Sequence, residues 1–390
     1  MDTKERFAIT TGGDYHGKNI LAPMVRVGTL PMRLLAAQYG AHITYGEELI
    51  DRRVMTCRRV ENNALGTTDF IDKDQKLMFR TCEEERTRIV FQMGTADAVN
   101  ALKAAEIVCR DVQVIDINMG CPKHFSTSGD MGAKLLHKPD TVWDILTTLR
   151  RNLPCPVSCK IRLLDTPEKT LALAQMIERA DVIAMAVHGR YIPQRPRDPA
   201  HWDRISEVVA GMSIPVIANG DVFEHGDFER LRNDTGAVAA MTARGAQWNA
   251  SIFRHEGLLP LWQVKQDYVR HCIVTDNAVA NSKYVIKEMI MKHDTHSLEG
   301  VEGKAINKCK DLHSLAQLYD LDDFYCDVIK HRTRKRAADE SPNAAVIHQF
   351  DESQAKVARE HNDGQKDTPT SDFTERDELV SANTSVHAAG

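Results

Sequence analysis

Short apolar runs alternate with amphipathic stretches from residue 19 to about residue 245, a pattern typical of repeated strand-helix units. Between the runs, apolar residues recur at three-to-four spacing and predict helices at 141–153, 167–179 and 202–211. Eight strands over roughly 225 residues match the size of a TIM barrel, so we expect an α/β fold of the (β/α)8 type; a doubly wound open sheet is the alternative. The expected strands are residues 19–25, 42–47, 89–93, 114–118, 157–162, 182–188, 215–219 and 237–243.

Other parts of the chain depart from this alternation. Residues 65–81 contain two strand-like pieces around turn residues and predict an inserted hairpin. From about residue 251 the pattern is helical without strands, which predicts a smaller all-helical domain with helices at 261–271, 278–291 and 304–319. The polar, acid-rich end has few aromatic residues, so we expect a disordered C-terminal tail. The expected domains are the barrel at 1–250, the helical domain at 251–330 and the tail at 331–390.

Composition narrows the class of protein. Of 390 residues 42% are hydrophobic, and no apolar run approaches the roughly 18 to 20 residues of a membrane span, so we expect no membrane. The N-terminal sequence resembles neither a secretory signal nor a transit peptide. Nine cysteines without close pairs do not suggest a disulfide framework and favour a reducing, cytoplasmic location, although the basic cluster at 332–336 would also fit a nuclear signal.

We expect a monomer without a metal site. Cys155 and Cys159 have a spacing that zinc could accept, but no second pair of ligands stands nearby. The net charge is -5, so any surface that binds nucleic acid must be positive locally rather than over the whole protein.

Polar residues follow nearly every expected strand at its carboxyl end, where TIM barrels build their active sites. Lys160 and Arg162 are two residues apart and therefore share one face of a strand. Two cations on one face require an anionic or carbonyl-rich ligand, and a flavin fits because its reduced ring carries negative charge. Gln92 and Asn118 offer amides for the edges of a heterocycle, and His188 lies on the same rim unless it is an ordinary core histidine.

The last two strand ends predict a phosphate site. Gly220 and Gly245 would let backbone N–H groups approach an anion, Arg244 adds charge, and a short helix expected near Gln247 adds its positive end. The alternative is that these are ordinary turn glycines. No G-x-G-x-x-G or P-loop pattern is present, which argues against those nucleotide sites. The same loops carry Asn219 and Asp221.

A cysteine stands where the strand at 114–118 runs into a loop. Cys121 lies between Gly120, which gives the backbone freedom, and Pro122, which prevents the strand from continuing. A thiol displayed there favours a reactive group, whereas a free cysteine is otherwise a small buried hydrophobe.

Together these segments resemble the tRNA-dihydrouridine synthase family, flavin enzymes that reduce a uracil ring in tRNA. The resemblance covers about residues 15–330 and is closest to the eukaryotic branch that acts on uridine 20 of cytoplasmic tRNA. The matching segments, in family order, are LAPMV at 21–25, FQMG at 91–94, INMGCPK at 117–123, GAKLL at 132–136, CKIR at 159–162, HGR at 188–190, ANGD at 218–221 and ARGA at 243–246.

The resemblance implies an FMN-containing barrel, a helical domain that helps to bind tRNA, and NADPH or NADH as the electron donor. Hydride would pass to C6 of a uridine extruded from the tRNA, and Cys121 would be the general acid that protonates C5. Asn118, Lys160 and Arg162 would face this uridine. The residues that would bind FMN are Pro23, Met24, Gln92, Lys160, His188, Asn219, Gly220, Asp221, Arg244 and Gly245.

Two features depart from the family pattern. Asp130 stands where relatives usually have a glycine, in a loop that should close over substrate. Residues 331–390 lack the pattern of the double-stranded-RNA-binding domain that animal relatives often append, so RNA affinity must come from elsewhere. Candidate phosphate contacts are Arg52, Arg53, Arg58, Arg59, Lys123, Arg190, Arg195, Arg197 and the cluster at 332–336.

Two other functions remain open. A flavin oxidoreductase of a free pyrimidine or another small molecule could use the same side chains, but would not need the helical domain. A non-catalytic RNA-binding protein would not need Cys121, Lys160 and His188, which are all present.

Overall fold

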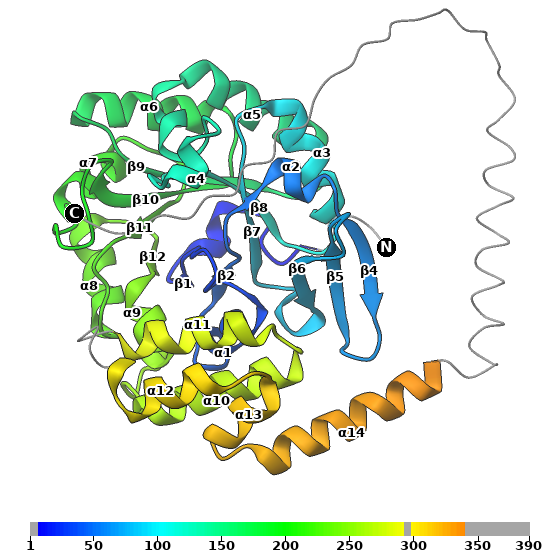
Figure 1. The fold of residues 1–390 in the computed structure, drawn as a ribbon. Coiled ribbons are helices and arrows are strands. Elements are labelled where there is room, and N and C mark those ends of the chain that lie inside the picture. The colour runs from blue at the N-terminus through cyan, green and yellow to red at the C-terminus, as the bar shows by residue number, and fades with distance from the viewer. Residues whose placement is uncertain (1–6, 292–297, 340–390) are drawn as a thin grey trace, which may run out of the picture. The chain divides into compact units, whose positions relative to one another are not determined.

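The computed structural model describes residues 7–291 and 298–339, and the fold below concerns the contact unit Met1–Arg336. Eight parallel strands close into a barrel because β2 pairs with β7 as well as with β1 (Figure 1). The predicted TIM barrel is confirmed, and the open-sheet alternative is wrong because that pairing leaves no free edge. The short β3 (Leu49–Ile50) adds to the end of β7. The barrel strands are β1 (Asn19–Leu21), β2 (Ile43–Tyr45), β7 (Ile89–Gly94), β8 (Val114–Met119), β9 (Val157–Leu163), β10 (Ala184–Tyr191), β11 (Val216–Asn219) and β12 (Ala239–Thr242).

Alternation along the strands separates two apolar cores. Odd-numbered residues of β8, such as Ile115 and Ile117, face the surrounding helices and belong to the larger core. Inside the barrel, the fully buried rings of Tyr15 and Tyr45 pack beside small side chains such as Ala186. Together these side chains fill the amino-terminal half of the interior. The carboxyl half of the interior is thereby left to polar side chains.

The helices between the strands begin where local sequence predicts. Thr166 caps α6 by accepting a hydrogen bond from the Lys169 amide, and Pro167 occupies the first turn, where no amide donor is needed. The helices predicted at 141–153, 167–179 and 202–211 are present within two residues at each end. The helices of the barrel region are α1 (Leu30–Gln38), α2 (Asp51–Val54), α3 (Ala98–Val108), α4 (His124–Thr127), α5 (Pro139–Asn152), α6 (Pro167–Arg179), α7 (Trp202–Ala210), α8 (Gly226–Thr235) and α9 (Arg244–Trp248), with 3-10 turns at Gly12–Tyr15, Glu83–Glu85, Gly132–His137 and Ala250–Phe253.

The insertion is a three-stranded antiparallel sheet rather than a hairpin. It consists of β4 (Arg58–Asn62), β5 (Thr67–Ile71) and β6 (Leu77–Cys82). The prediction missed β4 because most of its side chains are polar and it has no alternating apolar pattern. A buried ion pair ties the insertion to the barrel: Arg33 on α1 donates two hydrogen bonds to Glu85 just after β6, at 2.7 and 2.8 Å.

The region after residue 260 is helical, as predicted, and packs on the barrel: α10 contacts α1, and α11 contacts α9. The single helix predicted at 304–319 is wrong, because the chain breaks after Lys308 and Asp311 starts a new helix by accepting from the Ser314 amide. The boundary expected at residue 250 stays a prediction, because residues on both sides of it belong to one contact unit. The helices are α10 (Leu261–Val274), α11 (Val279–Ile290), α12 (Val301–Lys308), α13 (Leu312–Leu318) and α14 (Asp322–Asp339).

The expected tail begins inside a helix. Because α14 ends at Asp339, residues 331–339 are helical, while 340–390 lie outside the described residues. None of the described helices is long and apolar enough to cross a membrane.

We expect Arg33→Ala to lower the free energy of unfolding by about 3–5 kcal/mol, because it leaves the buried Glu85 carboxylate without its partner. The matched control is Arg86→Ala, which removes an exposed pair with Glu83 and should cost less than about 1 kcal/mol. Urea unfolding of both variants measures the difference, and equal losses would contradict the assigned role.

Candidate active site

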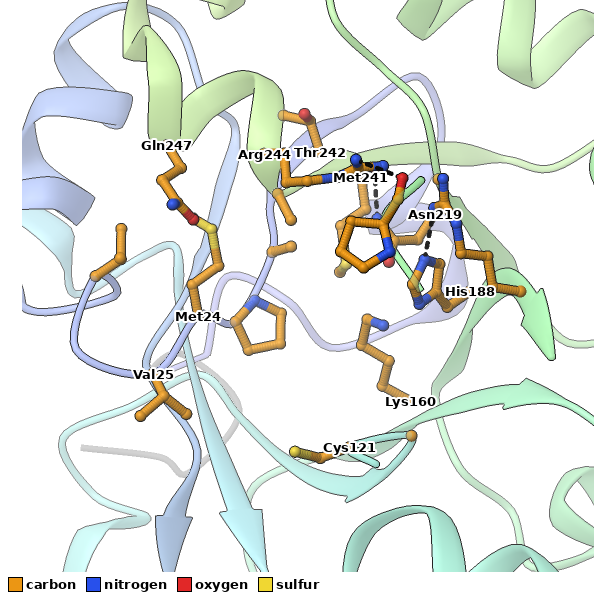
Figure 2. A pocket seen from close by; sticks show the side chains of 18 of the residues that line it. Met24, Val25, Cys121, Lys160, His188, Asn219, Met241, Thr242, Arg244 and Gln247 are labelled. Carbon is orange, nitrogen blue, oxygen red and sulfur yellow. Dashed lines mark hydrogen bonds between the residues drawn. The ribbon is translucent and has the colours of Figure 1, made fainter. Parts of the chain in front are cut away.

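The carboxyl ends of the strands open into one cavity of about 730 Å³ (Figure 2). Except for Gly245, every site residue predicted from sequence lines it: Pro23, Met24, Gln92, Asn118, Cys121, Lys160, Arg162, His188, Asn219, Gly220, Asp221 and Arg244. Gly245 serves packing instead, because a Cβ there would lie 2.4 Å from the Val222 carbonyl oxygen. Its hydrogen side chain lets α9 sit directly on the preceding loop.

A buried carboxyl group lies behind Gln92, which lines the cavity. Asp116 accepts hydrogen bonds from Ser158 Oγ at 2.6 Å and from Gln92 Nε2 at 2.8 Å. Burial raises the pKa of Asp116 to about 6, although both hydrogen bonds oppose the rise. The Gln92 carbonyl in turn accepts from Asn118 Nδ2 at 3.3 Å, so the two predicted amides belong to one network.

The turn that carries Cys121 is held from two sides. The Asn118 side-chain oxygen accepts from the amides of Gly120 and Cys121 at 2.9 and 3.0 Å. Arg162 Nε donates to the Gly120 carbonyl at 2.7 Å. Asn118 and Arg162 therefore fix the thiol in place as well as lining the cavity.

Basic side chains gather in this cavity with few counter-charges. Burial, and then the charge of Arg162, lowers the pKa of Lys160 to about 7. Burial and neighbouring cations likewise lower the pKa of Arg162 to about 10 and hold the pKa of His188 well below its ordinary value. The ring of His188 lies 3.2 Å from Arg190 Nη1. An anion placed among these groups would be stabilised strongly.

Asp221 clamps the two arginines beside this cavity. Its Oδ1 accepts from Arg190 at 2.5 Å and from Arg244 at 2.7 Å, and its Oδ2 accepts from the Ala200 amide. Gly220 and Asp221 both have positive φ, 141° and 55°, so the loop after β11 turns sharply here. The short helix beyond β12 begins at Arg244, three residues earlier than expected, which places the arginine itself in the first turn.

The thiol of Cys121 is protonated at neutral pH. Burial, and then the charge of Glu48, raises its pKa to about 11. A group that keeps its proton is suited to be a general acid. Glu48 was missed from sequence, although it follows the second strand and the strand-end rule that identified the other residues applies to it as well.

The loop after Cys121 accommodates Asp130 in a backbone conformation that glycine prefers. Its φ is 61°, and its carboxylate pairs with Lys134 and Lys138 at 3.2 and 2.8 Å. Aspartate is among the few residues that adopt this conformation readily, so the departure from the family pattern preserves the turn and adds local ion pairs.

The helical region supplies part of the cavity wall, which sequence did not indicate. Tyr284 and Glu288 on α11 line it together with Gln247 on α9. Gln247 donates to Glu288 at 2.6 Å, and the guanidinium of Arg26 lies 3.8 Å from the centre of the Tyr284 ring.

Several basic residues expected to contact RNA are engaged within the protein. Arg190 is 3% exposed, and Arg332 is 8% exposed and bonded to Asp276. Arg59 is held by both oxygens of Asp111. These three side chains already have partners within the protein, and RNA contacts stay a prediction for all of the candidates.

One group of metal-ligating type occurs among the described residues. Ligand atoms of His313, Asp322 and Cys326 lie within 4.8 Å of one another, on α13 and α14 rather than in the cavity. His313 Nε2 is 2.6 Å from Asp322 Oδ1, an ion-pair or hydrogen-bond contact.

A closed (β/α)8 barrel with a thiol, amides and an excess of cations at its carboxyl ends is the arrangement typical of barrel enzymes and suits an anionic ligand. The comparisons with known proteins identify the particular family. The chain belongs to the dihydrouridine synthase family, whose model matches residues 20–318.

Named relatives agree with this family. A Schizosaccharomyces pombe protein named tRNA-dihydrouridine(20) synthase (NAD(P)+) is 38% identical over 288 residues, covering 71% of this chain and 60% of that protein. A Saccharomyces cerevisiae protein of the same name is 35% identical over 298 residues, covering 71% of this chain and 78% of that protein. A human protein named tRNA-dihydrouridine(20a/20b) synthase (NAD(P)+)-like is 34% identical over 239 residues, covering 60% of this chain and 70% of that protein.

We expect Lys160→Met to raise the free energy of unfolding of the ligand-free protein by about 2 kcal/mol or more at pH 7. The pKa of this lysine is about 7 in the folded chain and about 10.5 in the unfolded chain, so between these values the unfolded state binds more protons. The wild type therefore gains stability as pH rises from 7 to 10.5, and the advantage of the variant shrinks over that range.

Urea unfolding at pH 7 and pH 9.5 checks this expectation. The control is Lys134→Met at an exposed position, whose effect should be small and should not change with pH in this way. A Lys160→Met variant no more stable than the wild type at pH 7 would show that the lysine is not strained by burial.

Proposed function

We propose that this chain is a tRNA-dihydrouridine(20) synthase, an FMN-dependent enzyme that uses NADPH or NADH to reduce a D-loop uridine of tRNA to 5,6-dihydrouridine. The observation that carries the proposal is the protonated thiol of Cys121, fixed in the same cavity as Lys160 and the amide of Asn118. This is the donor set that reduction of a pyrimidine double bond requires. The names of the two fungal relatives support uridine 20 as the position.

The chemistry of the cavity fits FMN. Lys160, Arg162 and Arg244 all have lowered pKa values because of burial and neighbouring cations, and a phosphate and an anionic ring would relieve that repulsion. When bound, FMN supplies the hydride for C6 of the uracil. We assign its binding to Pro23, Met24, Gln92, Lys160, His188, Asn219, Gly220, Asp221 and Arg244, with Gly245 acting through the packing of α9.

The side chains of this protein bind the uracil and deliver a proton. We propose that Asn118, Lys160 and Arg162 orient the ring, with amide and cationic donors for its carbonyl oxygens. The S–H bond of Cys121 breaks as its proton moves to C5. The raised pKa of Cys121 supports this role, because the thiol arrives at the reaction with its proton in place.

The uridine must leave the folded tRNA to enter this cavity. We assign part of the tRNA binding to the helices α10 to α14, because α11 lines the cavity. The chain spans about three fifths of the length of the S. pombe relative. The activity of the whole protein on tRNA is therefore part of this proposal. A cytoplasmic, metal-free monomer remains our expectation for the protein.

Cys121→Ala should retain bound FMN and lose uridine reduction by roughly 10²–10⁴-fold, because the general acid is gone while the cofactor contacts remain. Mass spectrometry of nucleosides from a uridine-20 tRNA transcript measures the product, and the visible spectrum measures the flavin. Cys57→Ala, at a half-buried cysteine outside the cavity, is the matched control and should behave as wild type. Protein that binds no flavin would refute the proposal, and turnover of free uracil but not tRNA would replace it with a small-molecule reductase.

Arg244→Met should weaken FMN binding by about tenfold or more, because a charge-assisted contact to phosphate is lost. Arg230→Met, which removes an exposed arginine paired with Asp227 on α8, should leave the affinity unchanged. Fluorescence titration of deflavinated protein with FMN gives both dissociation constants. Equal affinities for the two variants would place the phosphate elsewhere.

A further inference from the structure

Glu48 is a buried acid whose bonding is incomplete. It lies in the loop between β2 and β3, is 5% exposed and lines the cavity. Ser126 Oγ donates to its Oε1 at 2.8 Å, whereas its Oε2 is buried without a hydrogen-bond partner among the described residues. A buried carboxylate oxygen without a donor is costly, and protonation would turn that oxygen into a donor.

The surrounding backbone fits this carboxyl group closely. A Cβ on Gly94 would lie 2.6 Å from Glu48 Oε1. A Cβ on Gly132, whose φ is 59°, would lie 2.5 Å from both Ser126 Oγ and the Cys121 carbonyl oxygen. The absence of a side chain at these two positions leaves room for Glu48, Ser126 and the Cys121 turn to approach one another, and at Gly132 the nearby Cys121 backbone enforces it.

Glu48 lines the same cavity as the thiol, and its partner Ser126 lies beside the Cys121 turn. Burial, and then the charge of Glu48, raise the pKa of Cys121. Burial in turn raises the pKa of Glu48, while Ser126, the Cys121 thiol, Asn118 and the charge of Lys123 act in the opposite direction. The groups that face this carboxyl are therefore a serine, an amide, a thiol and one lysine.

The proposed reaction requires that Cys121 regain its proton after each turnover. Each turnover removes the proton of Cys121 and leaves a thiolate in a half-buried place where the charged form is unfavourable. Arg162 is committed to the Gly120 carbonyl, and Lys160 belongs to the set assigned to the flavin and the uracil. Glu48 lines the same cavity, and its charge acts on the thiol.

We propose that Glu48 is a proton-relay residue that acts through Cys121, returning a proton to the thiolate after each turnover; this inference rests on the function proposed above. In the first step the S–H bond of Cys121 breaks as the C5–H bond forms. In the second, the O–H bond of Glu48 breaks as the S–H bond forms again. A proton from water then restores Glu48, so each turnover consumes one solvent proton and the relay transfers no electrons.

The first test reads the thiol without any turnover. Iodoacetamide is applied to the full-length holoprotein between pH 6 and pH 10, and the labelled Cys121 peptide is followed by mass spectrometry. Glu48→Gln should move the pH midpoint of labelling downward and speed labelling at pH 8 by fivefold or more, because a neutral amide no longer opposes the thiolate. The matched control is Glu47→Gln, whose neighbouring carboxylate accepts from the Arg26 amide instead, and its midpoint should not move.

The second test distinguishes the proton transfer of the first turnover from those of later turnovers. With a tRNA transcript, Glu48→Gln should keep the single-turnover rate within about threefold, because Cys121 starts with its own proton, while the steady-state rate falls tenfold or more at pH values below the pKa of Glu48. The wild-type steady-state rate should fall as pH rises through the pKa of Glu48, because only the protonated acid can give a proton to the thiolate. The pH–rate profile of the variant should lack this decline.

An unmoved labelling midpoint, or equal losses in single-turnover and steady-state rates, would overturn the relay and leave Glu48 a structural residue. Should the glutamine variant not fold, Glu48→Asp replaces it: the shorter acid should lower the steady-state rate and spare the single turnover, and equal losses again overturn the relay. If wild-type protein reduces no uridine in tRNA, the proposed function fails, and the labelling result still reports whether Glu48 controls the thiol.

Discussion

Mutual repulsion among buried and half-buried cations is the constraint on which the rest of the site depends. Lys160 and Arg162 on β9, Arg190 on β10 and Arg244 on α9 line one cavity, and the closed sheet prevents them from moving apart. The protein holds them with backbone carbonyls and with Asp221, which is shared by two of the arginines. The charge that Asp221 does not neutralise remains for a ligand to neutralise, so the repulsion that folding leaves in place would favour the binding of an anion.

The same closure explains how a polar site survives inside an apolar fold. Alternation along β9 sends Ser158, Lys160 and Arg162 inward, while Cys159 and Ile161 pack against the helices. Bulky tyrosines fill the other end of the barrel, so the polar residues meet water or ligand only at the carboxyl side. Packing and chemistry therefore use opposite faces of the same strand and scarcely compete.

Sequence reasoning succeeded where one short-range rule applied and failed where contacts came from distant segments. The strands, and polar groups at their carboxyl ends, follow from period-two alternation and the barrel rule, and these located Lys160 and Asn118 correctly in the cavity. The role of Gly245 could not be predicted, because it depends on the Val222 carbonyl across the loop. The polar strand β4 has no apolar pattern to reveal it, since pairing with β5 alone defines it. The family resemblance rested on local motifs and so reached the same residues, but it too passed over Glu48.

The wall that α11 contributes has a consequence for how such enzymes diversify. Glu288 accepts a hydrogen bond from Gln247, on the barrel side, at 2.6 Å, and the Arg26 guanidinium lies over the Tyr284 ring. This part of the cavity wall is thus made by two regions that are far apart in the chain. A chimera that exchanges the helical region between relatives would have to exchange these barrel residues with it, so the two regions form one unit of inheritance.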